Sequence, residues 1–165
     1  MLECRLRDEA ATIAIGAALA TGFVELRVQA PSMPLCIHLL GELGAGKSTL
    51  ARALLRGLGV SGKIKSPTYA LVEPYDTRHG LLLHMDLYRL SEAAELEYLG
   101  IDSLFAQATL LLIEWPEKAG ALLPEPDLKI SLSHNSDANQ EGRRLQISGA
   151  SVSGNLLMPK LTAFF

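Results

Sequence analysis

The sequence predicts one α/β domain with a mainly parallel sheet, antiparallel additions near the C-terminus and helices on both faces. Three nearly continuous apolar runs predict the sheet, Leu35–Leu40, Leu81–Met85 and Leu110–Ile113, because strands covered on both faces have this composition. Segments with helical spacing separate these runs. The 165 residues, 48% hydrophobic and 20% charged, suffice for one domain but not for two ordinary ones. We assign residues 1–150 to the domain and residues 151–165 to a C-terminal tail.

The first half of the chain is expected to alternate helix and strand. Helical spacing covers residues 8–20, whose two leading acidic residues lie favourably near the positive end of the helix dipole. Residues 23–28 indicate a short extended piece, and residues 30–34, with two prolines, indicate a loop. A second helix is predicted over 47–58, because its leucines recur on one face and glycines mark its end.

Shorter elements are expected in the second half. Ser91 is a candidate N-cap for a helix over 92–99, and Asp102 is a candidate N-cap for a helix over 103–108. The remaining expectations are a strand over 69–72, a turn over 76–80, and alternating strands of the half-exposed or antiparallel kind over 128–132 and 145–147.

Composition narrows the classes of protein to consider. With 15 basic and 18 acidic residues, a formal net charge of −3, the chain is a poor candidate for holding nucleic acid alone, because that needs a basic face. Cys4 and Cys36 lie far apart, which disfavours a disulfide framework or a cysteine zinc site. The stretch Ala10–Ala20 is short, rich in alanine and preceded by acidic residues, so it is interpreted as a core helix rather than a secretory signal or membrane span. We expect a cytoplasmic protein with no membrane partner.

A glycine-rich segment joins the first apolar strand to the second helix. Residues 41–48, Gly-Glu-Leu-Gly-Ala-Gly-Lys-Ser, match the phosphate-binding pattern G-x-x-x-x-G-K-[ST] in the strand–loop–helix setting that it requires. Glycines let the backbone curl so that several N–H groups point at one anion, and the helix N-terminus adds positive partial charge. The Lys47 ammonium reaches for the β- and γ-phosphates, and the Ser48 hydroxyl is a candidate Mg²⁺ ligand. The prediction is a single P-loop NTPase domain whose nucleotide is bound by Glu42, Leu43, Gly44, Ala45, Gly46, Lys47, Ser48 and Thr49.

Two carboxylates end predicted interior strands, at the edge where open α/β sheets bind ligands. Asp86 follows LLLHM, and Glu114 follows LLLI. P-loop proteins need a carboxylate near Mg²⁺ and a group that orients the attacking water. One of the two is expected to hold Mg²⁺ and the other to orient the water, which makes both candidate catalytic residues beside Lys47. The competing interpretation is that each caps the turn that follows it.

Other side chains admit two interpretations. Thr68 lies in the loop after the second helix, where switch loops sense the γ-phosphate, but plain turn chemistry also suits it. Arg89 is a candidate either to stabilise transition-state charge or to form a surface ion pair. Trp115 either walls the nucleotide site or packs in the core. The histidines are interpreted as satisfied core residues, His38 and His84, and as loop residues, His79 and His134.

Four motifs occur in order along the chain, and the combination is more specific than any one of them. They are Gly-Glu-Leu-Gly-Ala-Gly-Lys-Ser-Thr (41–49), Ser-Pro-Thr-Tyr (66–69), His-Met-Asp-Leu-Tyr-Arg-Leu (84–90) and Leu-Ile-Glu-Trp-Pro-Glu (112–117). Together they resemble the TsaE family, formerly YjeE, whose fold is a single P-loop α/β domain. The resemblance spans about residues 8–144. It departs at Ser48, where the family usually has Thr, at Met85, where it usually has Phe, and over residues 23–34, which are longer than usual.

The resemblance implies a function. Members of the family act in bacterial tRNA threonylcarbamoyladenosine synthesis, where they bind ATP with Mg²⁺ and hydrolyse it slowly. They work with the TsaD–TsaB pair, which transfers the threonylcarbamoyl group to adenosine 37 of tRNAs that read ANN codons. The resemblance therefore implies ATP as substrate, Mg²⁺ as cofactor, TsaD and TsaB as partners, tRNA reached mainly through the complex, and hydrolysis that resets the complex between turnovers.

The resemblance also implies roles for individual residues. The segment around Thr12 is expected to border the adenine. The other implied roles are phosphate binding for Lys47, metal binding for Ser48 and Glu114, a Walker-B-like role for Asp86 and a switch-like role for Thr68.

Three other classes of nucleotide-binding protein are weighed against this one. A GTPase would carry the strings [NT]-K-x-D and D-x-x-G, and neither occurs in the chain. A small-molecule kinase would need an acceptor pocket and usually an arginine-rich lid, and no lid-like insertion is evident. A non-catalytic nucleotide-binding module is disfavoured by the intact Lys47 and Ser48 and by the two strand-end carboxylates.

Overall fold

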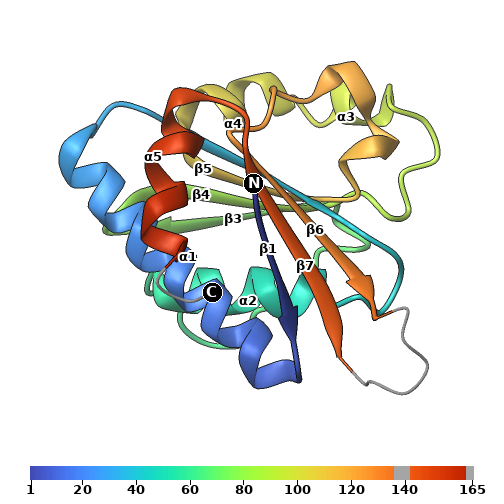
Figure 1. Cartoon of the computed structure of the whole chain (residues 1–165). Coiled ribbons are helices and arrows are strands. Elements are labelled where there is room, and N and C mark those ends of the chain that lie inside the picture. The colour runs from blue at the N-terminus through green and yellow to red at the C-terminus, as the bar shows by residue number, and fades with distance from the viewer. Residues whose placement is uncertain (136–141, 163–165) are drawn as a thin grey trace.

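The computed structural model describes residues 1–135 and 142–162. Within them, seven strands form one sheet in the order β1-β7-β6-β2-β5-β4-β3, flanked by helices (Figure 1). In chain order the elements are β1 (Leu2–Leu6), α1 (Glu9–Gln29), β2 (Leu35–Leu40), α2 (Lys47–Gly57), β3 (Val72–Thr77), β4 (Gly80–Asp86), α3 (Glu95–Tyr98), α4 (Ile101–Gln107), β5 (Ala108–Glu114), the 3₁₀ helices η1 (Pro116–Lys118) and η2 (Gly120–Leu122), β6 (Leu128–His134), β7 (Arg143–Gly149) and α5 (Val152–Leu161).

The four central strands run parallel. β2 pairs with β5 on one side and β6 on the other, and β4 extends the parallel set beyond β5. The outer strands β3, β7 and β1 are antiparallel to their neighbours. The predicted α/β class with a parallel centre is therefore confirmed. β6 is parallel to β2 and antiparallel to β7. Its sequence alternates because one face of the strand is buried and the other is partly exposed. The sequence analysis did not predict β1.

Side chains of the interior strands alternate between two cores, one on each face of the sheet. Leu39 and Leu112 pack with residues of α1, α2 and α5, whereas Leu111 and Ile113 pack with residues of α3 and α4 (Figure 1). Residues two apart in a strand share a face. Glu114 therefore lies on the same face as Leu112, toward α2.

Helix α1 is longer than the sequence indicated. It continues to Gln29, and the prediction of an extended piece over 23–28 is wrong. Phe23 and Leu26 are fully buried, as is Leu19. Their spacing of four and three residues keeps them on one helical face, so packing against the core extends the helix through this segment.

Helices α1 and α2 pack with very close backbones. A Cβ added to Gly16 of α1 would lie 2.5 Å from the Cβ of Ala53, and one added to Gly57 of α2 would lie 2.5 Å from that of Ala20. Small residues at these positions therefore set the helix separation. By length and composition α1 is long and apolar enough to cross a membrane, and half of its most apolar stretch is buried inside the protein.

Three boundaries differ from the predictions. A strand was predicted over residues 69–72, but β3 begins only at Val72 and continues to Thr77. It is a polar edge strand paired with β4, so the turn between them is shorter than the predicted 76–80. The helix expected after Ser91 shortens to α3, because the Glu95 carboxylate accepts the N–H groups of Ser91 and Glu92 outside the helix. Helix α4 begins at Ile101, two residues earlier than expected.

Most of the segment interpreted as a tail forms helix α5. The helix packs on α1 and β7, and its Leu157 is fully buried, whereas Leu156 is 45% exposed. Leu157 thus docks on the body as expected, and Leu156 lies mainly in solvent. Phe164 and Phe165, for which docking was also expected, lie outside the described residues.

Candidate functional site

The loop that joins β2 to α2 lies at the carboxyl end of the parallel strands. Gly41, Gly44 and Gly46 have φ angles of +136°, +78° and +105°, a region that favours glycine because it has no Cβ. Gly41 also lies so close to the backbone carbonyl of Leu132 in β6 that an added Cβ would overlap it. The glycines of the motif are therefore required by the curl of the loop and by its contact with β6.

Lys47, the first residue of α2, folds back over this loop. Its ammonium donates to the carbonyl oxygens of Gly41 at 2.6 Å and Glu42 at 2.8 Å. It also lies 3.8 Å from the ring centroid of Trp115, a cation–π contact. Burial lowers the pKa of Lys47, although nearby carboxylates act in the opposite direction. The ammonium is thus held over the loop by two carbonyl oxygens, whose place the oxygens of an anionic ligand would take.

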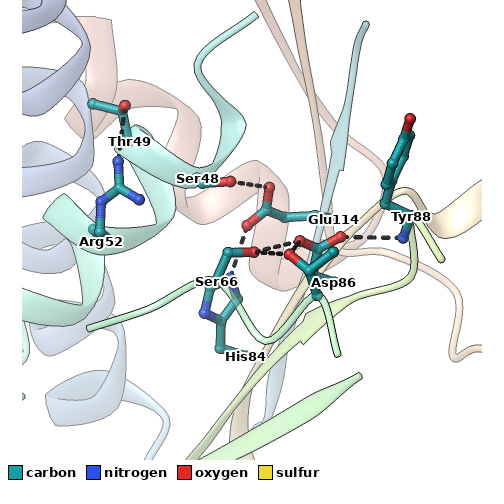
Figure 2. A network of polar contacts seen from close by, with 9 residues as sticks. Ser48, Thr49, Arg52, Ser66, His84, Asp86, Tyr88 and Glu114 are labelled. Carbon is teal, nitrogen blue, oxygen red and sulfur yellow. Dashed lines mark hydrogen bonds and ion pairs between the residues drawn. The ribbon is translucent and has the colours of Figure 1, made fainter. Parts of the chain in front are cut away.

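Glu114 ends β5 and is almost completely buried, with 1% of its surface exposed. The Ser48 hydroxyl donates to its Oε2 at 2.8 Å, and His84 Nε2 lies 2.8 Å from its Oε1 (Figure 2). Each oxygen of this carboxylate therefore has its own partner, one from the start of α2 and one from β4.

Asp86 ends β4 and lies directly opposite Glu114 in the register of β4 and β5. The hydroxyls of Ser66 and Thr68 donate to its Oδ2, the second at 2.8 Å, and the backbone N–H of Tyr88 donates to its Oδ1 at 3.1 Å (Figure 2). Asp86 thereby ties the loop after α2 to the sheet edge, which places the Thr68 hydroxyl at the site.

A cavity of about 350 Å³ lies between the glycine loop, the two strand ends and the loop around Thr68. It is polar on several sides and lies where α/β sheets bind ligands. Its lining residues are Leu43, Gly44, Gly46, Lys47, Ser48, Thr49, Ser66, Thr68, Asp86, Tyr88, Arg89, Glu114, Trp115 and Arg143.

Three residues predicted to bind the nucleotide do not line this cavity. Ala45 is fully buried in the core. Glu42 has an exposed side chain and contributes its carbonyl oxygen to Lys47. Thr12 is fully buried, and its hydroxyl accepts a hydrogen bond from Arg143 at 3.2 Å. Thr12 therefore contacts Arg143, which lines the cavity, rather than the cavity itself.

The sequence analysis assigned no role to three residues at the site. Arg143 comes from β7, and its guanidinium lies beside Gly46, where an added Cβ would be 3.0 Å from its Nε. Ser66 was quoted only as part of a motif, and Tyr88 only as part of another. Serine and threonine near a loop proline suggest a turn, and no local signal connects Arg143, about a hundred residues away, to the glycine loop.

The structure also places the three residues that admitted two interpretations. Trp115 lines the cavity and packs against Tyr88, with ring centroids 5.1 Å apart. Arg89 lines the cavity too, and its guanidinium lies 4.3 Å over the ring of Tyr69. Thr68 bonds a cavity carboxylate rather than only its own turn.

The interpretations of three histidines need correction. His84 is buried, but it bonds Glu114 in the site, and its Nδ1 has no hydrogen-bond partner among the described residues. His38 Nε2 is likewise buried and without a partner there, so neither histidine is fully satisfied. His134 ends β6 rather than lying in a loop, whereas His79 lies in the turn before β4.

The donors beside Lys47 suit a hard divalent cation. Ser48 Oγ and Glu114 Oε2 are oxygen atoms held 2.8 Å apart. Mg²⁺ is typically held by one or two protein oxygens together with phosphate oxygens and waters. The described residues contain no group of three or more His, Cys, Asp or Glu side chains arranged for a metal ion. These residues fit a magnesium ion that shares its coordination with a phosphate ligand.

The sheet and the site define a class, α/β proteins with a polar ligand cavity at the carboxyl edge of their parallel strands. A sequence comparison identifies the family within that class. The family described as "Threonylcarbamoyl adenosine biosynthesis protein TsaE" matches residues 6–145. The chain therefore belongs to the TsaE family, as its four motifs indicated.

Relatives and a solved structure agree with this membership. The tRNA threonylcarbamoyladenosine biosynthesis protein TsaE of Haemophilus influenzae is 40% identical over 131 residues, which cover 79% of this chain and 81% of the relative. The protein of the same name from Bacillus subtilis is 35% identical over 105 residues, or 64% of this chain and 65% of the relative. The crystal structure of Bacillus subtilis YdiB superposes with a TM-score of 0.74 at 26% identity, covering 98% of this chain and 94% of that one.

Proposed function

We propose that this protein is a Mg²⁺-dependent P-loop ATPase of tRNA threonylcarbamoyladenosine biosynthesis. It acts with the TsaD–TsaB pair, and its hydrolysis of ATP resets that complex between turnovers. Membership of the TsaE family supports the pathway. The observation that carries the ATPase activity is the convergence of Lys47, Ser48 and Glu114 on one cavity beside a curled glycine loop.

The main work of the loop and Lys47 is electrostatic. Phosphoryl transfer needs little covalent help from the protein, so positioning and charge stabilisation dominate catalysis. The loop curls around the site that we assign to the phosphates, and the N-terminus of α2 adds positive partial charge. Lys47 exchanges the carbonyl oxygens of Gly41 and Glu42 for phosphate oxygens, which bond an ammonium more strongly because they are charged.

Ser48 and Glu114 are the residues that would hold Mg²⁺. When bound, the ion neutralises charge that develops on the transferring phosphate. Asp86 and Thr68 occupy the neighbouring corner of the cavity, linked by a hydrogen bond of 2.8 Å. We assign to Asp86 the orientation of the attacking water and to Thr68 the sensing of the γ-phosphate.

Two arginines line the cavity, and both have other contacts. Arg89 stacks on Tyr69, which is 83% exposed, and Arg143 bonds Thr12. An arginine that stabilises the transition state raises the rate of phosphoryl transfer by about 10³–10⁵-fold when it is free to reach the phosphate. We infer that hydrolysis by the isolated protein is slow and that a partner which contacts the Tyr69 surface accelerates it.

The route to tRNA passes through the partners. The chain carries a formal net charge of −3, and a protein that contacts tRNA mainly as part of a complex does not need a strongly basic face of its own. We further propose that the protein works in the cytoplasm and without a membrane partner.

The deciding experiment measures ATP hydrolysis by the purified protein alone, with TsaD, with TsaB and with the TsaD–TsaB pair. Slow turnover that requires Mg²⁺ and rises with the pair is expected, and the Lys47→Ala protein serves as the inactive control. Fast turnover that is indifferent to the partners contradicts the proposal. Turnover that appears only with a small-molecule phosphate acceptor would favour a kinase instead.

A further inference from the structure

His84 has no part in the chemistry described above and does not line the cavity, yet it is a fully buried polar side chain in contact with Glu114. It lies on β4 two residues before Asp86 and therefore on the same face of the sheet. We propose that His84 is a positioning residue for the metal site: its Nε2–H holds the Glu114 carboxylate so that Oε2 stays turned toward Ser48. This inference rests on the proposed function and extends it.

The contact is short and shielded from solvent. His84 Nε2 and Glu114 Oε1 are 2.8 Å apart, with side-chain exposures of 0% and 1%. A carboxylate this deeply buried needs a donor for each oxygen, because an unsatisfied charged group in the interior is costly. Ser48 supplies one of these donors and His84 the other.

The surroundings of the ring identify which nitrogen carries the hydrogen. Nδ1 is buried and has no hydrogen-bond partner among the described residues. A hydrogen on Nδ1 would be a buried donor without an acceptor, whereas a hydrogen on Nε2 has Glu114 Oε1 beside it. The geometry therefore assigns a hydrogen to Nε2, which donates it to the carboxylate.

The two partners of Glu114 differ in what ligand binding does to them. The Ser48 oxygen is the atom proposed to bind the metal, so its hydrogen bond to Oε2 is rearranged when the site is filled. The His84 bond lies on the other oxygen and persists. His84 thus keeps the carboxylate from rotating at the moment when Ser48 no longer restrains it. Partners of this kind, when removed, typically change metal affinity by about 10–100-fold.

Two amide substitutions of His84 distinguish a role in positioning Glu114 from a role in core packing alone. In His84→Gln the amide nitrogen lies about as far from the backbone as Nε2 and replaces the donor. In His84→Asn the amide matches the position of Nδ1, which has no partner, and it does not reach Glu114. Both variants replace a ring with a polar amide, so a role in packing alone predicts similar effects for both.

The test measures binding of a fluorescent ADP analogue in EDTA and over a Mg²⁺ titration. We expect His84→Asn to bind as the wild type does in EDTA, within about twofold, but to need about 10–100-fold more Mg²⁺ for the metal-dependent gain in affinity. His84→Gln should recover most of the difference. Leu82→Ala, a buried change two residues earlier on the same face, should lower stability without changing the Mg²⁺ requirement.

A second readout needs no nucleotide. A long-range ¹H–¹⁵N spectrum of wild-type protein labelled at its four histidines should contain an Nε2–H signal that is missing from the spectrum of His84→Gln. If the ring that His84→Gln loses carries its hydrogen only on Nδ1, or if Asn, Gln and wild type require equal Mg²⁺, the inference is overturned and the ATPase proposal stays intact. Wild-type nucleotide affinity that ignores Mg²⁺ overturns the proposed function and this inference with it.

Discussion

Asp86 and Glu114 lie directly opposite each other at the carboxyl ends of two adjacent parallel strands, yet their side chains share no hydrogen-bond partner among the described residues. Glu114 bonds Ser48 and His84, whereas Asp86 bonds the hydroxyls and N–H of the neighbouring loops. Their separate networks indicate two different roles, one toward the start of α2 and one toward the Thr68 loop.

The first prediction concerns Glu114. Glu114→Ala should impair Mg²⁺-dependent turnover more than nucleotide binding, because it removes a proposed metal ligand and leaves the glycine loop and Lys47 in place. Turnover and binding of the nucleotide are compared at saturating Mg²⁺, with Glu97→Ala as an exposed acidic control in α3. If binding falls more than turnover, the metal role assigned to Glu114 is wrong.

Lys47→Ala tests whether the Lys47 ammonium beside the glycine loop binds phosphate. ATP hydrolysis should fall by at least about 100-fold and nucleotide binding should weaken, since the proposed phosphate partner is lost. Lys118→Ala, an exposed lysine in η1, should behave as the wild type. The chain's single tryptophan, Trp115, touches Lys47, so its fluorescence should change when nucleotide displaces the ammonium. Unchanged hydrolysis in the Lys47→Ala protein would refute the site.

The environment of Lys47 also predicts a pH dependence. Burial lowers its pKa from the usual 10.5, so the free protein loses this charge at a lower pH than a surface lysine does. Nucleotide affinity that depends on the ammonium is complete below that pKa and declines as pH rises through it. Titrating affinity from neutral to alkaline pH should therefore show a decline that begins below 10.5 and is absent from Lys47→Ala. A flat profile in the wild type counts against an electrostatic role.

Arg143 and Arg144 are consecutive residues of β7, so one can be tested and the other can serve as its control. Arg143→Gln should weaken nucleotide binding by about tenfold, as expected when a charged donor to an anionic ligand is lost. Arg144→Gln changes the next residue of β7, whose guanidinium is 55% exposed and pairs with Glu3 on the surface, and should leave affinity unchanged. Equal losses in the two variants would mean that general charge, rather than a contact in the cavity, matters.

Helix α5 gives a prediction about stability. Leu157 is fully buried and packs against Gly22 of α1, so Leu157→Ala should lower the free energy of unfolding by about 2–5 kcal/mol. Leu156→Ala changes the adjacent, 45% exposed side chain and should stay within about 0.5 kcal/mol of the wild type. Chemical denaturation of both variants measures the difference. A negligible loss for Leu157→Ala would show that α5 contributes little to the folded domain.

The interior strands and the glycine loop were readable from sequence because their requirements are local. A strand buried on both faces needs an apolar run, and a loop with positive φ at Gly41, Gly44 and Gly46 needs glycines at those positions. Helix α1 was read too short because residues 23–28 owe their conformation to burial against the core rather than to local signals. Edge strand β1 was missed, and edge strand β3 was predicted too early in the chain, because one side of an edge strand faces solvent and its sequence is mixed.

The sequence by itself determined the class of fold, the glycine-rich turn before α2 and the two carboxylates at strand ends, because each follows from residues that are neighbours in the chain. Only the tertiary structure decided that Arg143 reaches Gly46, that Ser66 and Thr68 bond Asp86, and that His84 bonds Glu114. These contacts join segments that lie 18 to about 100 residues apart. Their geometry depends on strand order, register and packing, which no local pattern of residues specifies.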